Sequence, residues 1–404
     1  MRTSLFCSLV DVADAGAEQV LDDVCGRAGL DRVTISTAYH AVRDLLPHAR
    51  TRRVRSIQAG LWIPRDPKLW KQSVLQPQMA GDETTDKALA DLLERARAAE
   101  RQVDGWTVFL HADRAGFDDG LGAECNVFGD CYPEQLCPAD PLTQIYATTL
   151  ARAVVRSGMP TVVAESLHFH GLEHGVHHER LLFEPGPVGR FLLGLCMCQH
   201  CLEAGARAGI DVERFAVDVR RMLQTAFDSG QQVVGSVETL EQASQLCGGE
   251  MGRWIRVRQD TVTKLVERVA VACREESGQL VLLDMSGAAK GYADGLPTGL
   301  PAAAEAWRLG LDLEAIAVFC SIEAIAYAHD PARVALDLDV YRQRLPGDTL
   351  CGAILRPFGT DCSDLQNLTT KVELCRQAGL ERLDFYHYGL MPLPTLDRIR
   401  LSLE

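Results

Sequence analysis

The chain has 404 residues, of which 47% are hydrophobic and 24% charged, and its formal net charge is −14. This composition is typical of a globular protein with a large core. The acidic balance argues against nucleic acids and anionic membranes as partners, because proteins that bind phosphates present basic patches. The one basic run, His48–Arg55, is short and is interpreted as a solvated loop.

Neither membrane insertion nor secretion is expected. No apolar stretch reaches the roughly 20 residues that span a bilayer. Thr3–Val10 is apolar, but Asp11 and Asp14 follow where a signal peptide would be cleaved, so we interpret this run as a first strand. Fourteen cysteines without a secretory signal predict a reducing, cytoplasmic location, which favours thiols or metal ligands over disulfides.

Eight short apolar or β-branched runs are typical of buried parallel strands. They are Ser4–Val10, Arg32–Ser36, Trp106–Leu110, Thr161–Ala164, Leu280–Leu283, Ala315–Phe319, Gly352–Leu355 and Leu383–Tyr386. Between them, apolar residues recur at i, i+3 and i+4, which predicts helices. These are Ala15–Ala28, Lys87–Gln102, Leu142–Ser157, Val212–Ala226, Ser236–Cys273, Ala302–Leu309, Pro331–Arg344, Ser363–Ala378 and Leu396–Leu403. The alternation predicts an α/β fold, a single (β/α)₈ TIM barrel over residues 1–404.

The predicted strands are unevenly spaced. Long βα loops follow strand two (about Thr37–Thr85), strand three (Ala112–Asp140) and strand four (Glu165–Ser277). The last of them contains a helical insertion at about residues 203–275, interpreted as a lid or a dimer surface. The second interpretation would make the protein a homo-oligomer. Because βα loops form the catalytic face of barrel enzymes, we expect a deep site on that face.

The sharpest local motif is Cys196-Met197-Cys198-Gln199-His200-Cys201, a C-x-C-x2-C run at the start of a helix. Three thiolates at this spacing fit three corners of a Zn²⁺ tetrahedron. Cys137, which precedes Pro138 in a loop that also opens a helix, is the predicted fourth ligand. Such a closed site is structural, and the alternatives are buried thiols or redox thiols.

The order of these motifs resembles a known family. Cys137-Pro138-Ala139-Asp140-Pro141 precedes a helix, a strand ending in glutamate follows, and then the C-x-C-x2-C run, within residues 137 to 210. This order is similar to that of the zinc-containing β-galactosidases of glycoside hydrolase family 42. The resemblance implies a (β/α)₈ enzyme with a structural zinc and Glu165 as the acid/base. Leu355-Arg356-Pro357 stands where the family has its nucleophilic glutamate, and Ala164 where it has asparagine before the acid/base.

Polar residues follow the ends of the predicted strands. Glu165 is the candidate general acid/base, because apolar surroundings favour a neutral carboxyl group that can donate a proton near pH 7. Asp284 is the candidate partner carboxylate for an oxocarbenium-type reaction, with a loop cap as its alternative role. The candidate substrate-binding residues are Tyr39, His40, His111, Asp113, His177, His178, Glu179, Glu323, Arg356, Tyr386 and His387.

The loop from His168 to Glu179 carries five of the eleven histidines. Three interpretations compete: a catalytic metal held with Glu165 and Glu179, a sugar pocket, or a structural polar loop near the cysteines. The spacing of the histidines and glutamates in this loop does not match the H-E-x-x-H pattern of zinc proteases.

These observations predict a glycoside-hydrolase-like enzyme that acts on a small carbohydrate or glycoside. One alternative is a metal-dependent sugar lyase or isomerase with a second metal at the histidine-rich loop. The other is a non-catalytic sugar-binding barrel. The sequence contains no phosphate-binding loop, no Rossmann fingerprint after the first strand and no G-x-S-x-G elbow, which disfavours nucleotide and serine hydrolase chemistry.

Overall fold

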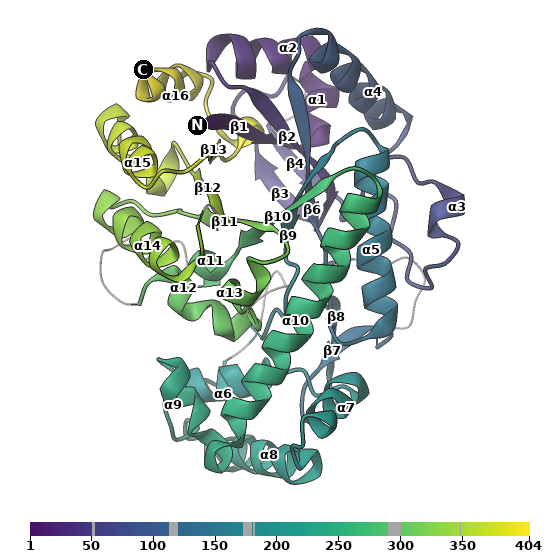
Figure 1. Cartoon of the computed structure of the whole chain (residues 1–404), viewed down its shortest axis with the longest axis vertical. Coiled ribbons are helices and arrows are strands. Elements are labelled where there is room, and N and C mark those ends of the chain that lie inside the picture. Colours follow the sequence, from purple (N-terminus) through teal and green to yellow (C-terminus); the bar gives the residue numbers. More distant parts are fainter. Residues whose placement is uncertain (51–52, 113–119, 173–179, 181, 290–299, 348) are drawn as a thin grey trace.

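The computed structural model describes residues 1–50, 53–112, 120–172, 180, 182–289, 300–347 and 349–404 (Figure 1). Eight parallel strands form a closed barrel in the order β1-β13-β12-β11-β10-β9-β6-β2, and β2 pairs with β1 to close it. The strands are β1 (Arg2–Cys7), β2 (Arg32–Tyr39), β6 (Gln102–Val108), β9 (Thr161–Glu165), β10 (Gln279–Asp284), β11 (Ser321–Ile325), β12 (Leu350–Leu355) and β13 (Arg382–Phe385). The predicted (β/α)₈ fold is confirmed.

Helices surround the barrel. Several begin at an aspartate whose side chain accepts a hydrogen bond from a backbone N–H of the first turn, as Asp82, Asp140, Asp330 and Asp364 do. The helices between strands are α1 (Leu9–Ala15), α2 (Ala17–Leu21), η1 (Asp22–Arg27), α4 (Glu83–Ala98), α5 (Pro141–Arg156), α11 (Ser286–Ala289), α12 (Ala302–Glu305), η3 (Ala306–Leu309), α13 (Leu313–Ile316), α14 (Pro331–Arg344), η4 (Gly359–Asp361), α15 (Leu365–Gln377), η5 (Tyr388–Leu390) and α16 (Pro394–Leu403). No helix in the described ranges is both long and apolar enough to cross a bilayer.

The prediction for the sixth strand is wrong. The run expected to be that strand, Ala315–Phe319, overlaps helix α13, and the strand is β11, which begins at Ser321. The Asp312 side chain accepts a hydrogen bond from the N–H of Ala315, which starts a helical turn. A short buried apolar run does not distinguish helix from strand by its periodicity, and here the cap decides.

The predicted helix Ser236–Cys273 is divided. The structure has α9 (Leu240–Ser244), η2 (Leu246–Gly249) and α10 (Glu250–Glu275) in its place. Gly248 and Gly249 have φ angles of 68° and 95°. Glycine adopts this left-handed conformation readily, and it interrupts the helix there.

The long loops contain further structure. The loop after β2 holds the hairpin β3 (Val42–Leu45) and β4 (Val54–Ile57), strand β5 (Gly60–Leu61) and α3 (Pro67–Trp70), and the loop after β6 holds the hairpin β7 (Ala123–Cys125) and β8 (Cys131–Leu136). After β9 come α6 (Gly186–Leu193), α7 (Gln199–Arg207) and α8 (Val212–Ser229). In Figure 1 these three helices and α9 gather at one end of the molecule, and α10 runs from them along the barrel beside α5.

Buried charges occupy the barrel interior near the first residues of its strands. Asp104 on β6 accepts hydrogen bonds from Arg32 (3.1 Å) and Arg382 (2.7 Å), and Arg382 also contacts Asp384 (2.8 Å) and Glu323 (3.6 Å). The Asp104, Glu323 and Asp384 side chains are fully buried. Charges removed from water are tolerated only when they are paired, so this network holds five residues in one arrangement.

The network predicts a large effect of one substitution on stability. Asp104→Ala leaves Arg32 and Arg382 without their shared carboxylate, so we expect the free energy of unfolding to fall by about 3–5 kcal/mol in urea denaturation. The matched control is Asp91→Ala, which removes the exposed partner of Arg95 and is expected to change stability little. Equal losses in the two variants would contradict a structural role for the network.

Candidate functional site

Glu165 is the last residue of β9, and the strand register directs it into the barrel. It pairs with Val108 of β6, on the same face of that strand as Asp104 and Trp106. The Trp106 indole Nε1–H donates a 2.6 Å hydrogen bond to Glu165 Oε2. Burial raises the pKa of Glu165 to about 7, and the bond from Trp106 lowers it in part. Trp106 was not among the predicted site residues, although its inward position two residues before the end of β6 is a signal that sequence alternation carries.

Two tyrosines lie close to Glu165. Tyr39 ends β2 and Tyr386 directly follows β13, and their hydroxyl oxygens are 3.4 Å apart. The Trp106 ring contacts both, with its centroid 4.6 Å from that of Tyr39 and 5.8 Å from that of Tyr386. Burial raises the pKa of both hydroxyls, that of Tyr386 to about 12, and the Glu165 charge adds to this effect. Both tyrosines are therefore protonated at neutral pH, and because one hydroxyl donates to the other, the pair has one proton left to donate.

Arg356 follows β12 and borders the same aromatic group. Its guanidinium carbon lies 4.4 Å from the ring centre of Tyr327 and 5.8 Å from that of Tyr386, within the range of cation–π attraction. The guanidinium also forms a 2.7 Å ion pair with Asp361, so its charge is already balanced within the protein. Tyr327 was not predicted, because it follows the strand whose position the sequence analysis misplaced.

The histidines form a row of ring contacts. His40 stacks on Tyr39 at 4.2 Å and on His111 at 4.9 Å, and His111 lies 5.8 Å from His170. His168 continues the row at 5.2 Å from His170. The predicted residues His40 and His111 thus come together with Tyr39. Four other predicted site residues, Asp113, His177, His178 and Glu179, lie outside the described residues.

His387 lies below the aromatic group. It is 2% exposed, its Nε2 lies 3.2 Å from the Ser8 hydroxyl, and its ring centre lies 5.9 Å from that of Trp106. Burial lowers the pKa of His387 to about 3, so the ring is neutral at physiological pH. A neutral, enclosed imidazole supports the walls of the site, and the placement does not favour the predicted direct contact with substrate.

Asp284 does not lie beside Glu165. The register pairs Leu283 with Glu323, whose carboxylate contacts Arg382 inside the barrel, so Asp284 faces outward. There it accepts hydrogen bonds from the hydroxyl of Tyr341 on α14 and from the N–H of Ser286 (2.9 Å). The placement does not support Asp284 as the partner carboxylate, and it agrees with the alternative of a loop cap.

Glu323 also departs from its expected place. It lies in the middle of β11 and not at a strand end, because the sixth strand begins later than predicted. Burial and the Asp384 charge raise the pKa of Glu323, while Arg382 lowers it. Glu323 belongs to the buried charge network, so the structure does not support the predicted contact with substrate.

The four predicted metal ligands form one cluster. Cys137 Sγ lies 3.5 Å from Cys201 Sγ and 3.6 Å from those of Cys196 and Cys198. Zn–S bonds of about 2.3 Å in a tetrahedron place sulfur atoms about 3.8 Å apart, close to these distances. In the described ranges, this is the one group of His, Cys, Asp and Glu side chains close enough to hold a metal ion.

The cluster is connected to the row of histidines. The Cys125 N–H lies 3.5 Å from Cys196 Sγ, and the Met197 N–H donates to the Cys125 carbonyl (2.7 Å). The neighbouring Glu124 accepts a hydrogen bond from the N–H of His170 (2.9 Å). Hairpin β7–β8 therefore links the cysteines to the loop after β9. Its Cys125–Cys131 pair is a disulfide, whereas the sequence analysis favoured thiols or metal ligands throughout.

Comparison with known proteins shows the fold. No family model and no curated protein matches the chain. The chain is similar to the catalytic domain of β-amylase from Paenibacillus polymyxa, with a TM-score of 0.51 and 9% identity over 98% of this chain and 94% of that one. It is also similar to a chitinase from Chromobacterium violaceum (TM-score 0.41, 6% identity, 100% and 98% covered) and to D-allulose 3-epimerase from Methylomonas (0.40, 10%, 100% and 96%). The likeness to the β-amylase domain shows the TIM-barrel fold alone, and the resemblance to family 42 stays a prediction.

The neutral state of His387 predicts how stability depends on pH. An unfolded histidine binds a proton below about pH 6.5, whereas folded His387 does so only near pH 3. The free energy of unfolding therefore falls by up to about 1.4 kcal/mol per pH unit as the pH falls between these values. His387→Gln removes this contribution, so from about pH 6.5 to about pH 5 the free energy of unfolding of the wild type should fall by about 1.6 kcal/mol more than that of the variant in urea denaturation. Parallel pH dependence of the two proteins would contradict a buried neutral ring.

Proposed function

We propose that the chain is a glycoside-hydrolase-like enzyme that acts on a small carbohydrate or glycoside, with Glu165 as its general acid/base. The observation that carries this proposal is the carboxyl group of Glu165 at the C-terminal end of β9, where burial raises its pKa to about 7. A group with this pKa is partly protonated at neutral pH. It can donate a proton to the leaving oxygen and take one from water in the same cycle.

The neighbours of Glu165 support a sugar as the substrate. Tyr39 and Tyr386 share a hydrogen bond between hydroxyls 3.4 Å apart, which leaves one hydroxyl proton to donate to a ligand, and their rings with that of Trp106 present aromatic faces. Sugars bind through hydrogen bonds to their hydroxyls and through contact of their apolar faces with aromatic rings. In this proposal His40 and His111 extend the binding surface along the loop after β9. The charge of Arg356 is balanced by Asp361, so in this proposal its guanidinium holds Tyr327 and Tyr386 in place beside an uncharged sugar ring.

Glu165→Gln tests the proposal. We expect hydrolysis of nitrophenyl glycosides, measured over a panel of common sugars, to fall by about 10²–10⁴-fold, because the amide cannot transfer the proton. Asp284→Asn is the matched carboxylate control. It should lower the melting temperature, through its bonds to Tyr341 and Ser286, and retain the rate of the folded enzyme.

Three outcomes separate the candidate functions. An active enzyme whose rate survives Glu165→Gln would contradict the proposed role. Activity lost on chelation, with the cysteine-bound metal retained, would favour a metal-dependent lyase or isomerase that uses the histidine-rich loop. Sugar binding without turnover of any glycoside in the panel would favour a non-catalytic barrel.

We also propose that Cys137, Cys196, Cys198 and Cys201 hold a structural zinc ion. Four thiolates would leave the ion no open position for substrate, so it would brace the loop after β9 and not take part in the reaction. The side chain of Arg258, 3% exposed, lies near Glu124 and three of these cysteines, where its charge would offset part of the negative charge of a tetrathiolate site. The zinc proposal does not depend on the expected cytoplasmic location, which the Cys125–Cys131 disulfide does not favour.

Elemental analysis tests the zinc proposal. We expect one zinc per wild-type chain, none or a small fraction in Cys198→Ser, and a lower melting temperature for that variant, because metal binding is coupled to folding. Cys25→Ser, at a partly exposed cysteine outside the cluster, is the control and should keep its zinc. Equal zinc contents in the two variants, or no zinc in the wild type, would contradict the proposal.

A further inference from the structure

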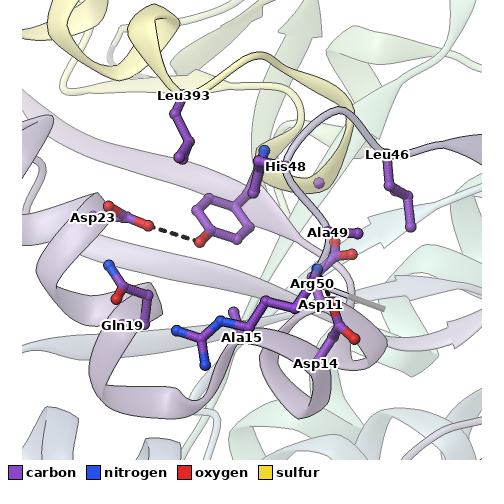
Figure 2. A pocket seen from close by; sticks show the side chains of 12 residues that line it. Asp11, Asp14, Ala15, Gln19, Asp23, Leu46, His48, Ala49, Arg50 and Leu393 are labelled. Carbon is purple, nitrogen blue, oxygen red and sulfur yellow. Dashed lines mark hydrogen bonds between the residues drawn. The ribbon is translucent and has the colours of Figure 1, made fainter. Parts of the chain in front are cut away.

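A separate pocket of about 200 Å³ lies beside the barrel mouth (Figure 2). Helices α1, α2 and η1 form one wall, and residues 46–50 after β3 and the segment after β13 form the other. None of its lining residues is shared with the site around Glu165. Its polar lining side chains are Asp11, Asp14, Gln19, Asp23, His48, Arg50 and Tyr388, and Asp14 forms a 3.2 Å ion pair with Arg55.

One short segment separates this pocket from the candidate active site. Tyr386 faces Glu165, the next residue His387 is buried between the two, and Tyr388 lines the pocket. His387 Nδ1 lies 3.9 Å from Asp11 Oδ2, so the wall between the two sites is about one side chain thick. The pocket thus lies on the same C-terminal side of the strands, where barrel proteins bind their ligands.

The pocket contains carboxyl groups that can bond to a ligand. Asp11 is 7% exposed, and its one hydrogen bond among the described residues comes from the Ser8 N–H to Oδ2 (3.3 Å), so it retains bonding capacity toward the pocket. Burial raises its pKa to about 7, so the group accepts from a ligand when ionised and can also donate when protonated. Asp23 accepts a 2.8 Å bond from the Tyr388 hydroxyl, the dashed line in Figure 2, which leaves its second oxygen available. A buried carboxylate with open acceptor positions favours a ligand that brings hydroxyl or N–H donors.

The pocket also contains donors. Gln19 and Arg50 both line it, and Figure 2 shows the Arg50 side chain crossing the pocket toward Gln19. Neither side chain makes a hydrogen bond to any residue that the structure describes. Asp11, Asp14 and Asp23 together with Arg50 place groups of both signs around the pocket, so a ligand with a single charge would meet a like charge on one wall. A neutral ligand with alternating donors and acceptors satisfies both kinds of group, and vicinal hydroxyl groups have this property.

We propose that this pocket binds one neutral sugar residue, whose hydroxyls donate to Asp11 and Asp23 and accept from Gln19 and Arg50. The volume agrees with a single ring, because pockets for larger, drug-sized ligands measure about 300–1,000 Å³. The choice of a sugar rests on the proposed function of the neighbouring site. The ligand would be either a separate monosaccharide or one unit of the chain that reaches Glu165.

Ligand-observed saturation-transfer NMR and calorimetry with glucose, galactose, mannose, xylose and N-acetylglucosamine test this proposal. At least one sugar should bind the wild type. The affinity should fall at least about tenfold in Ala15→Trp, which fills the pocket, and in the double variant Gln19→Ala, Arg50→Ala, whose side chains are exposed and make no bonds needed for folding. Glu165→Gln is the control and should keep this binding.

The outcomes also separate this inference from the proposed function. Binding that survives Glu165→Gln and is lost in Ala15→Trp supports the pocket even if no glycoside is hydrolysed. The inference is overturned if none of the five sugars binds, or if all binding persists in both pocket variants. Binding that is lost only in Tyr386→Ala places the sugar at the mouth and overturns it as well.

Discussion

The alternation of side chains along the strands of a closed barrel decides which polar residues form the site. Successive residues of a strand face opposite sides of the sheet, and closure turns these sides into interior and exterior. Glu165, in register with Val108, therefore points inward to Trp106, whereas Asp284, at the end of the next strand, points outward to Tyr341. Two carboxylates at neighbouring strand ends thus lie on opposite sides of the barrel wall.

Much of the architecture was predictable from the sequence. Buried β-branched runs and amphipathic helices recur in strict alternation, which specifies a parallel barrel, and the strand ends gave Glu165, Tyr39 and Tyr386 as neighbours. The grouping of Cys137, Cys196, Cys198 and Cys201 was also predictable, because a C-x-C-x2-C spacing is typical of metal ligands. These features depend on local patterns that persist in the folded chain.

The remaining features depend on contacts that sequence patterns do not contain. The sixth strand was misplaced because the apolar run at Ala315–Phe319 carries no helical period, and only the Asp312 cap marks the turn. That error moved Glu323 to a strand end and concealed Tyr327. The outward direction of Asp284 follows from the strand register, which pairing in three dimensions determines, and the Cys125–Cys131 disulfide depends on a hairpin that was not expected.

The central claim is that the barrel mouth holds the pKa of the Glu165 carboxyl group near 7. The titration of Glu165 in the wild type tests this claim most directly. The ¹³C resonance of its carboxyl carbon, assigned by its absence in Glu165→Gln, reports its protonation. The account predicts a midpoint near pH 7, because aromatic side chains exclude water and the single strong donor is the Trp106 indole. A midpoint near 4.5, the ordinary value for glutamate, would contradict it.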